Sequence, residues 1–120
     1  MSNQRNVLIK RDLEDLIKNR IGSGKAIIVL GPRQTGKTTL IKKILESEED
    51  ILMLNGDDSM EREKLETQNT ELLRHIIGQN KTVFIDEAQR IKNIGLTLKI
   101  IIDQIRPEQI FVTGSSSLEI

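Results

Sequence analysis

Cysteine is absent from the 120 residues of this chain. Disulfide bonds and thiolate metal sites therefore cannot hold the fold together. A fold that needs no disulfides is suited to a reducing compartment, so we predict a cytoplasmic location.

Aromatic residues and net charge are also scarce. The chain has two Phe, no Trp and no Tyr, and its 18 Lys and Arg are balanced by 18 Asp and Glu. So few aromatic side chains offer little surface on which the bases of a single strand can stack. A neutral chain also lacks the basic field that attracts phosphate backbones. The composition therefore does not support a nucleic-acid partner.

Long apolar runs are missing as well. No segment approaches the roughly 20 apolar residues that cross a bilayer, and the first residues lack the apolar stretch of a signal peptide. We therefore expect a soluble chain with no membrane partner. Its length suits one domain, and it stops a few residues after the last predicted strand. We expect residues 1–120 to be the N-terminal part of a single domain whose fold is incomplete at the C-terminus.

Short apolar runs alternate with segments of helical period, which is typical of βα units around a mainly parallel sheet. The helical spacing of apolar residues predicts a lead-in helix over 9–17 and further helices over 40–45, 65–76 and 98–105. The predicted strands are 26–30, 51–54, 83–85 and 110–112. The first is continuously apolar, as in a strand buried on both faces. The pattern predicts an α/β fold.

The first predicted strand runs directly into GPRQTGKT at positions 31–38, a full match to the phosphate-binding pattern G-x-x-x-x-G-K-[ST]. Such a P-loop meets phosphates with backbone N–H groups at the start of a helix, and its glycines allow close backbone approach. Lys37 supplies a cation for the β and γ phosphates, and the Thr38 hydroxyl is suited to bind magnesium. We expect a nucleotide with Mg²⁺ to be bound by Gly31, Thr35, Gly36, Lys37, Thr38 and Thr39.

Two acids follow the third predicted strand in TVFIDE, positions 82–87. Asp86 is placed to hold a magnesium ion through its hydration shell at the carboxyl end of the sheet. Glu87 is placed to polarise the water that attacks the γ phosphate. An acidic pair after a strand is by itself often only a solvated loop. The P-loop earlier in the chain favours the functional interpretation.

Small hydroxyl residues follow the fourth predicted strand in TGSSS, positions 113–117. One of these hydroxyls would reach the γ phosphate or the attacking water, and we select Ser115 for this catalytic role. The alternative is a serine-rich turn that caps a following helix. The residue types alone leave both interpretations open.

The segments GPRQTGKTTL, FIDEAQRI and FVTGSSSLEI, in this order, resemble the AAA-type ATPases of bacteria and archaea. The resemblance covers most of the chain and implies a three-layer P-loop NTPase fold. In that fold the strand of the third segment lies between the strands of the first two. The resemblance also implies ATP and Mg²⁺ as ligands, Asp86 as the magnesium acid, Glu87 as the catalytic base and residues 113–115 as the sensor of the γ phosphate.

Members of this family usually continue with the rest of the ATPase domain and a C-terminal domain that is often nuclease-like. The resemblance therefore implies contact with such a domain, or self-association. An arginine finger also usually comes later in the chain, and Arg90 and Arg106 are poor substitutes for it. Because such a residue contributes about 10³ to 10⁵ in rate, we expect nucleotide binding to be more robust than turnover.

Three functions of different classes fit these motifs. The first is an ATPase whose hydrolysis drives a conformational change, and its distinguishing residue is Glu87. The second is a P-loop phosphotransferase, which needs an acceptor pocket and an arginine-rich lid. The third is a helicase motor, which the string DEAQ at positions 86–89 resembles, but such a motor needs a second domain and nucleic-acid grooves that this neutral chain lacks. A non-enzymatic alternative is a nucleotide-binding switch without significant turnover.

Overall fold

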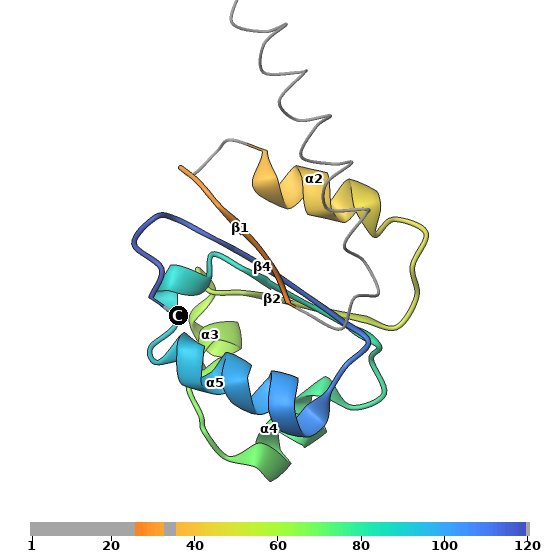
Figure 1. Cartoon of the computed structure of the whole chain (residues 1–120), viewed down its shortest axis with the longest axis vertical. Helices are drawn as coiled ribbons and strands as arrows, with labels where there is room; N and C mark the ends of the chain where they lie inside the picture. Colours follow the sequence, from red (N-terminus) through yellow and green to blue (C-terminus); the bar gives the residue numbers. More distant parts are fainter. Residues whose placement is uncertain (1–25, 33–35, 120) are drawn as a thin grey trace, which may run out of the picture.

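A parallel sheet lies at the centre of the computed structural model, which describes residues 26–32 and 36–119 (Figure 1). Its four strands are β1 (Ile27–Leu30), β2 (Ile51–Asn55), β3 (Thr82–Asp86) and β4 (Gln109–Gly114), and their order is β1-β4-β3-β2. All three pairings are parallel. The strand of the third segment therefore lies between those of the other two, as the resemblance implied.

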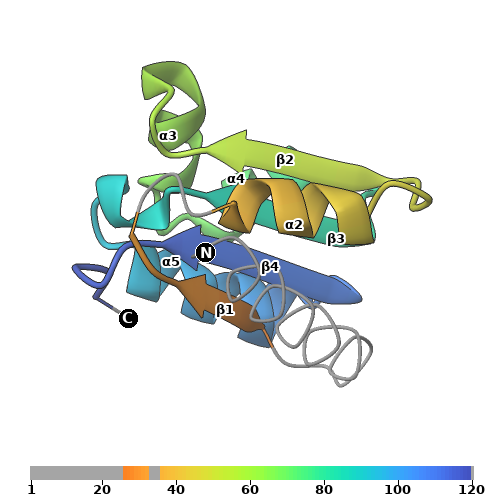
Figure 2. The same ribbon diagram turned by 90° about the horizontal axis from the view of Figure 1, so that it is seen from above.

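Helices cover both faces of the sheet (Figures 1 and 2). One face carries α2 (Lys37–Ile44), and the other carries α3 (Ser59–Leu65), α4 (Thr70–Ile77) and α5 (Ile94–Ile100). A 3₁₀ turn, η1 (Ala88–Arg90), follows β3, and a π-helical turn, η2 (Ile101–Ile105), continues α5. This three-layer arrangement confirms the predicted α/β class.

The core is divided by the sheet into two apolar layers. Successive side chains of a strand point to opposite faces, so each inner strand contributes to both layers. Both phenylalanines of the chain, Phe84 and Phe111, are fully buried against Ile41 of α2. Their strand neighbours face α4 and α5, and the buried members of this second layer include Val83, Ile85, Ile110, Val112, Leu73, Ile77 and Leu98.

The prediction of one helix over 65–76 was wrong, because the structure has two helices there. The Asn69 side chain accepts a hydrogen bond from the Leu72 backbone N–H (3.0 Å) and caps the start of α4. Asp58 caps α3 in the same way, by accepting from the N–H groups of Met60 and Glu61. The polar residues that interrupt the apolar period are therefore the start of a second helix.

The helix predicted over 98–105 begins earlier, at Ile94, and ends through η2. Arg106 follows in the left-handed region (φ 56°), directly before Pro107. A proline disfavours α conformation in the residue before it, which explains why the helix stops here.

The first strand was expected to be buried on both faces, but the structure buries only one of them. In β1, Ile27 and Val29 are buried against α2, whereas Ile28 and Leu30 are 40% and 52% exposed. Among the described strands, β1 pairs only with β4 and is therefore an edge strand. The lead-in helix predicted over 9–17 lies outside the described residues. No helix among the described residues is long and apolar enough to span a bilayer.

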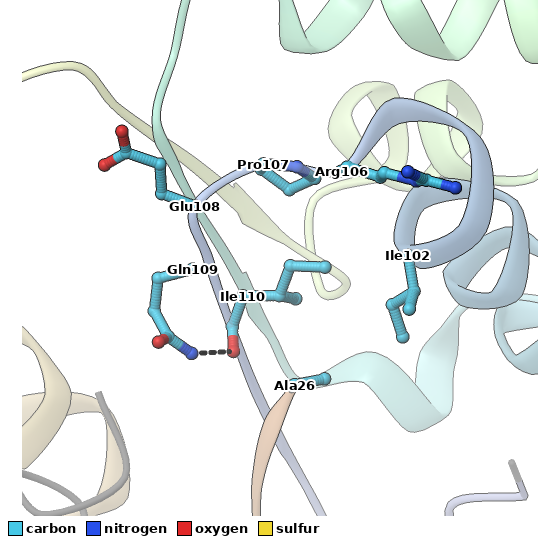
Figure 3. A pocket seen from close by; sticks show the side chains of 7 residues that line it. All are labelled: Ala26, Ile102, Arg106, Pro107, Glu108, Gln109 and Ile110. Carbon is cyan, nitrogen blue, oxygen red and sulfur yellow. Dashed lines mark hydrogen bonds between the residues drawn. The ribbon is translucent and has the colours of Figure 1, made fainter. Parts of the chain in front are cut away.

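A hollow of about 420 Å³ lies at the amino ends of β1 and β4 (Figure 3). Its lining includes Ala26, Arg106 and Pro107, and the Gln109 side chain donates to the Ile110 carbonyl oxygen (3.1 Å) at its wall. This hollow is at the end of the strands opposite to the P-loop. The predicted P-loop follows the carboxyl end of β1, at the other end of the sheet.

Candidate functional site

Three segments that are far apart in the sequence meet at the carboxyl ends of β1, β3 and β4. In a parallel sheet these ends share one edge, where α/β proteins commonly bind ligands. The Gly31 N–H donates to the Gly114 carbonyl oxygen (3.0 Å), so the P-loop starts in contact with the end of β4. The fold therefore brings together the three segments that the sequence singled out.

The described part of the P-loop leads directly into α2. Gly36 is the N-cap residue of this helix and has a φ of 86°, a left-handed conformation in which a side chain is disfavoured. Its carbonyl oxygen accepts from the Leu40 N–H (2.9 Å), which is the first hydrogen bond of the helix. Of the other predicted ligands in this loop, Thr35 lies outside the described residues and Thr39 is exposed on α2.

Lys37 is the first residue of α2, and its side chain is buried at the junction of β1 and β4. Its Nζ donates to the carbonyl oxygens of Pro32 (3.2 Å) and Gly114 (3.0 Å), and also to that of Gly31. A buried ammonium is tolerated only when its donors have partners. The three carbonyls hold this cation at the mouth of the loop, and phosphate oxygens would compete with them for it.

The Thr38 hydroxyl and the Asp86 carboxylate connect the P-loop to β3. Thr38 Oγ1 lies 2.8 Å from Asp86 Oδ1 and 2.9 Å from Oδ2. Hydroxyl and carboxylate oxygens are the ligand types that suit Mg²⁺, which also retains waters and phosphate oxygens in its shell. No three His, Cys, Asp or Glu side chains gather as a metal site in residues 26–32 and 36–119. The donor set fits a magnesium ion that is shared with a phosphate.

Thr113, at the end of β4, is a further contact of Asp86. Its side chain is fully buried, and its hydroxyl donates to Asp86 Oδ1. The same hydroxyl accepts from the Glu87 backbone N–H (3.2 Å). Sequence reasoning placed Thr113 in the sensor region but selected Ser115. The register of β3 against β4 indicates Thr113 instead. Ile85 pairs with Val112, and the next residues along the two strands are Asp86 and Thr113.

Glu87 turns the chain sharply at the end of β3. Its side chain is buried, and its backbone is left-handed (φ 52°, ψ 48°), which costs about 1–2 kcal/mol for a residue with a Cβ. Gly56 packs against this turn and donates its N–H to the Asp86 carbonyl oxygen (2.7 Å). A Cβ on Gly56 would lie 2.2 Å from the Glu87 carbonyl oxygen. The turn that presents Glu87 therefore requires a glycine after β2, which sequence reasoning missed.

Gln89, in η1, connects Glu87 to the third motif. Its Nε2 donates to Glu87 Oε2 (2.8 Å), and its Oε1 accepts from the Ser115 backbone N–H (3.1 Å). The Ser115 hydroxyl lies 2.6 Å from the Ser117 hydroxyl. Within this motif it is Thr113 that bonds to Asp86, while Ser115 contributes its main chain to the network.

The two arginines considered as substitutes for an arginine finger lie apart from this network. Arg106 lines the hollow at the amino ends of the strands (Figure 3). Arg90 is half-exposed, and its Nε lies 3.7 Å from Asp57 Oδ1. The described contacts of the Asp86 carboxylate are with Thr38, Thr113 and the Glu87 N–H, and neither guanidinium is among them.

Comparison with known proteins places this geometry in a family. Residues 23–120 match the family model described as an AAA domain. The chain is also 25% identical over 109 residues to the uncharacterized proteins Mb2031c of Mycobacterium bovis and Rv2008c of Mycobacterium tuberculosis. These matches cover 90% of this chain but only 24% of either relative. The family model indicates a nucleotide-binding, ATPase-type function, and the chain belongs to this family of AAA domains.

Proposed function

We propose that this domain binds ATP with Mg²⁺ and hydrolyses it to ADP and phosphate. The observation that carries the proposal is the contact of Thr38 and Thr113 with the Asp86 carboxylate, beside the buried Lys37. These contacts unite the P-loop, the acidic segment and the third motif at one edge of the sheet. Such a union is what a nucleoside triphosphate with a bound cation requires.

Each residue has a distinct role in this proposal. The P-loop main chain and the Lys37 ammonium bind the phosphates, with Gly31, Thr35, Gly36 and Thr39 completing the cradle. Thr38 and Asp86 would hold Mg²⁺. When bound, this ion neutralises charge on the β and γ phosphates.

Glu87 is proposed as the general base. As water oxygen bonds to the γ phosphorus, the bond from that phosphorus to the bridging oxygen breaks and ADP leaves. The water proton passes to the Glu87 carboxylate, which Gln89 holds by one oxygen (2.8 Å). Thr113 and Ser115 stand at the end of β4, where their segment would respond to loss of the γ phosphate.

We also propose that the hydrolysis acts on parts of a longer protein, through a C-terminal domain or a second copy of the chain. The curated relatives are about four times longer than the matched region, which covers 24% of their length. The resemblance implies an arginine finger later in the protein, and such a residue would raise the rate of turnover by about 10³ to 10⁵. A cytoplasmic location completes the proposal.

The first test is thermal unfolding with and without ATP and Mg²⁺. A ligand at 100 times its Kd stabilises the folded state by about 2.7 kcal/mol, which raises Tm by roughly 10 °C for a chain of this size. We expect this rise for the unmodified chain and for Glu87→Gln, but not for Lys37→Ala. The control Lys42→Ala changes an exposed lysine on the same helix and should keep the rise.

Phosphate release under single-turnover conditions then separates hydrolysis from binding. The unmodified chain should release phosphate, and Glu87→Gln should release it at least about 100-fold more slowly. Equal stabilisation of Lys37→Ala and the unmodified chain would refute the P-loop assignment. Stabilisation without any Glu87-dependent release would favour the nucleotide switch instead.

A further inference from the structure

One peptide group lies between Lys37 and the Gln89 side chain. The Gly114 carbonyl oxygen accepts from Lys37 Nζ (3.0 Å) and from the Gly31 N–H (3.0 Å). The N–H of the same peptide group belongs to Ser115 and donates to Gln89 Oε1 (3.1 Å). A peptide group is planar and rigid, so its carbonyl and N–H move together. Any rotation that changes the contact with Lys37 therefore also changes the contact with Gln89.

The Gln89 amide has one orientation that satisfies both of its neighbours. Its oxygen must face the Ser115 N–H donor, and its nitrogen must face the Glu87 carboxylate, which only accepts. A flipped amide would bring oxygen against carboxylate and N–H against N–H. The position of the Ser115 N–H therefore determines where Gln89 holds Glu87 Oε2.

Glycine at position 114 leaves room for this arrangement. A Cβ there would lie 3.2 Å from Gln89 Oε1 and 3.0 Å from Leu118 Cδ2. Both contacts are tighter than an ordinary van der Waals contact. The Gly114–Ser115 peptide group, which contacts both Lys37 and Gln89, thus fits here because residue 114 has no side chain.

We propose that the Gly114–Ser115 peptide group and the Gln89 side chain form a relay from Lys37 to Glu87. When phosphate takes the Lys37 ammonium from the Gly114 carbonyl oxygen, the peptide group loses a partner and reorients. Gln89 passes this change to the Glu87 carboxylate, so that the base is aligned only when a triphosphate is bound. Gln89 is thus a positioning residue for hydrolysis, and this role rests on the ATPase function proposed above.

The decisive variant is Gln89→Glu, because it separates the two hydrogen bonds of Gln89. When ionised, the introduced carboxylate still accepts from the Ser115 N–H but has no donor for Glu87, and it places a second negative charge beside that residue. We expect ATP with Mg²⁺ to raise Tm as in the unmodified chain, with Kd within about twofold, while kcat falls at least about tenfold. Gln68→Glu is the matched control, since Gln68 is an exposed glutamine that donates to Thr97 Oγ1 (3.4 Å), and it should keep both values.

A second measurement reports the relay without turnover. In the NMR spectrum of Glu87→Gln, ATP with Mg²⁺ should shift the Gln89 side-chain amide signals and change hydrogen exchange of the Ser115 N–H. ATP with Mg²⁺ added to Lys37→Ala should leave the Gln89 amide signals and the exchange of the Ser115 N–H unchanged. This measurement also decides the matter if Gln89→Glu does not fold.

The outcomes separate this inference from the proposed function. Glu87-dependent hydrolysis with an unchanged kcat in Gln89→Glu and unmoved Gln89 signals would overturn the relay and leave the ATPase intact. Failure of the unmodified chain to bind ATP would overturn both. A Gln89→Glu variant that loses nucleotide affinity and kcat together would show a structural role for Gln89, and would also overturn the relay.

Discussion

Replacing Thr113 with Val tests whether the end of β4 holds the Asp86 carboxylate. Valine has nearly the same shape as threonine, so the fully buried site stays filled. The substitution removes a hydroxyl that donates to Asp86 and accepts from the Glu87 N–H (3.2 Å). The Glu87 N–H keeps its other acceptor, Asp86 Oδ1 (3.1 Å), so the main loss is the donor to the carboxylate.

The expected magnitude follows from the charge of the acceptor. A hydrogen bond to a charged group contributes about 1.5–3 kcal/mol, against about 0.5–1.5 kcal/mol for a neutral pair. Thr113→Val should therefore lower the free energy of unfolding by roughly 2 kcal/mol and Tm by about 8 °C. Thr97 offers a matched control, since it is also fully buried and donates to a neutral acceptor, the Leu65 carbonyl oxygen (2.8 Å). Thr97→Val should cost about 1 kcal/mol.

The two variants should also differ in their response to nucleotide. Urea unfolding gives the two losses of stability, and thermal unfolding with ATP and Mg²⁺ gives the response. We expect Thr113→Val to weaken the stabilisation by nucleotide and to slow phosphate release, because Asp86 and the Glu87 main chain lose their common contact. Thr97→Val should keep both the stabilisation by nucleotide and the rate of phosphate release. Equal losses of stability in the two variants, with equal nucleotide responses, would refute the reasoning.

Further predictions concern the turn at Glu87 and the helix caps. Gly56→Ala should cost about 1–3 kcal/mol and reduce phosphate release, because its Cβ would meet the Glu87 carbonyl oxygen at 2.2 Å. Gly78→Ala, which strains a residue at φ 56° far from the acids, should lower Tm without changing the nucleotide response. Asp58→Ala and Asn69→Ala each remove an N-cap and should cost about 1 kcal/mol, or about 4 °C in Tm. Either cap variant would contradict this interpretation if its stabilisation by ATP also fell.

The sequence predicted the α/β fold well because its strands are short, apolar and followed by residues with strong local preferences. The P-loop pattern could be read directly, since the glycine at position 36 adopts the left-handed conformation that only its type favours. The division of 59–77 into α3 and α4 could not be read from apolar spacing alone. Asn69 lies between the apolar positions of 65–76, and its side chain starts a helix.

The site was less predictable where it depends on contacts between strands. Four hydroxyl residues, Thr113 and Ser115 to Ser117, lie at or just after the end of β4, and only the register shows that Thr113 meets Asp86. Gln89 bonds to Glu87 because the left-handed backbone of Glu87 and the 3₁₀ turn bring residues two apart together. The close packing of Gly56 against this turn likewise appears only when β2 is paired with β3.

The place of β4 in the sheet has a consequence during synthesis. Ile27 in β1 pairs with Phe111 in β4, which is made 84 residues later (111 − 27). At about 5–20 residues per second, β1 waits roughly 4–17 s on the ribosome for this neighbour. The hydrogen bond from Lys37 Nζ to the Gly114 carbonyl oxygen and the hydrogen bond from the Thr113 hydroxyl to Asp86 also depend on β4. A nascent chain therefore acquires its proposed nucleotide site in one step. By the proposed function, ATP would therefore bind only after β4 has joined the sheet, and it would not assist the folding of β1, β2 and β3 before then.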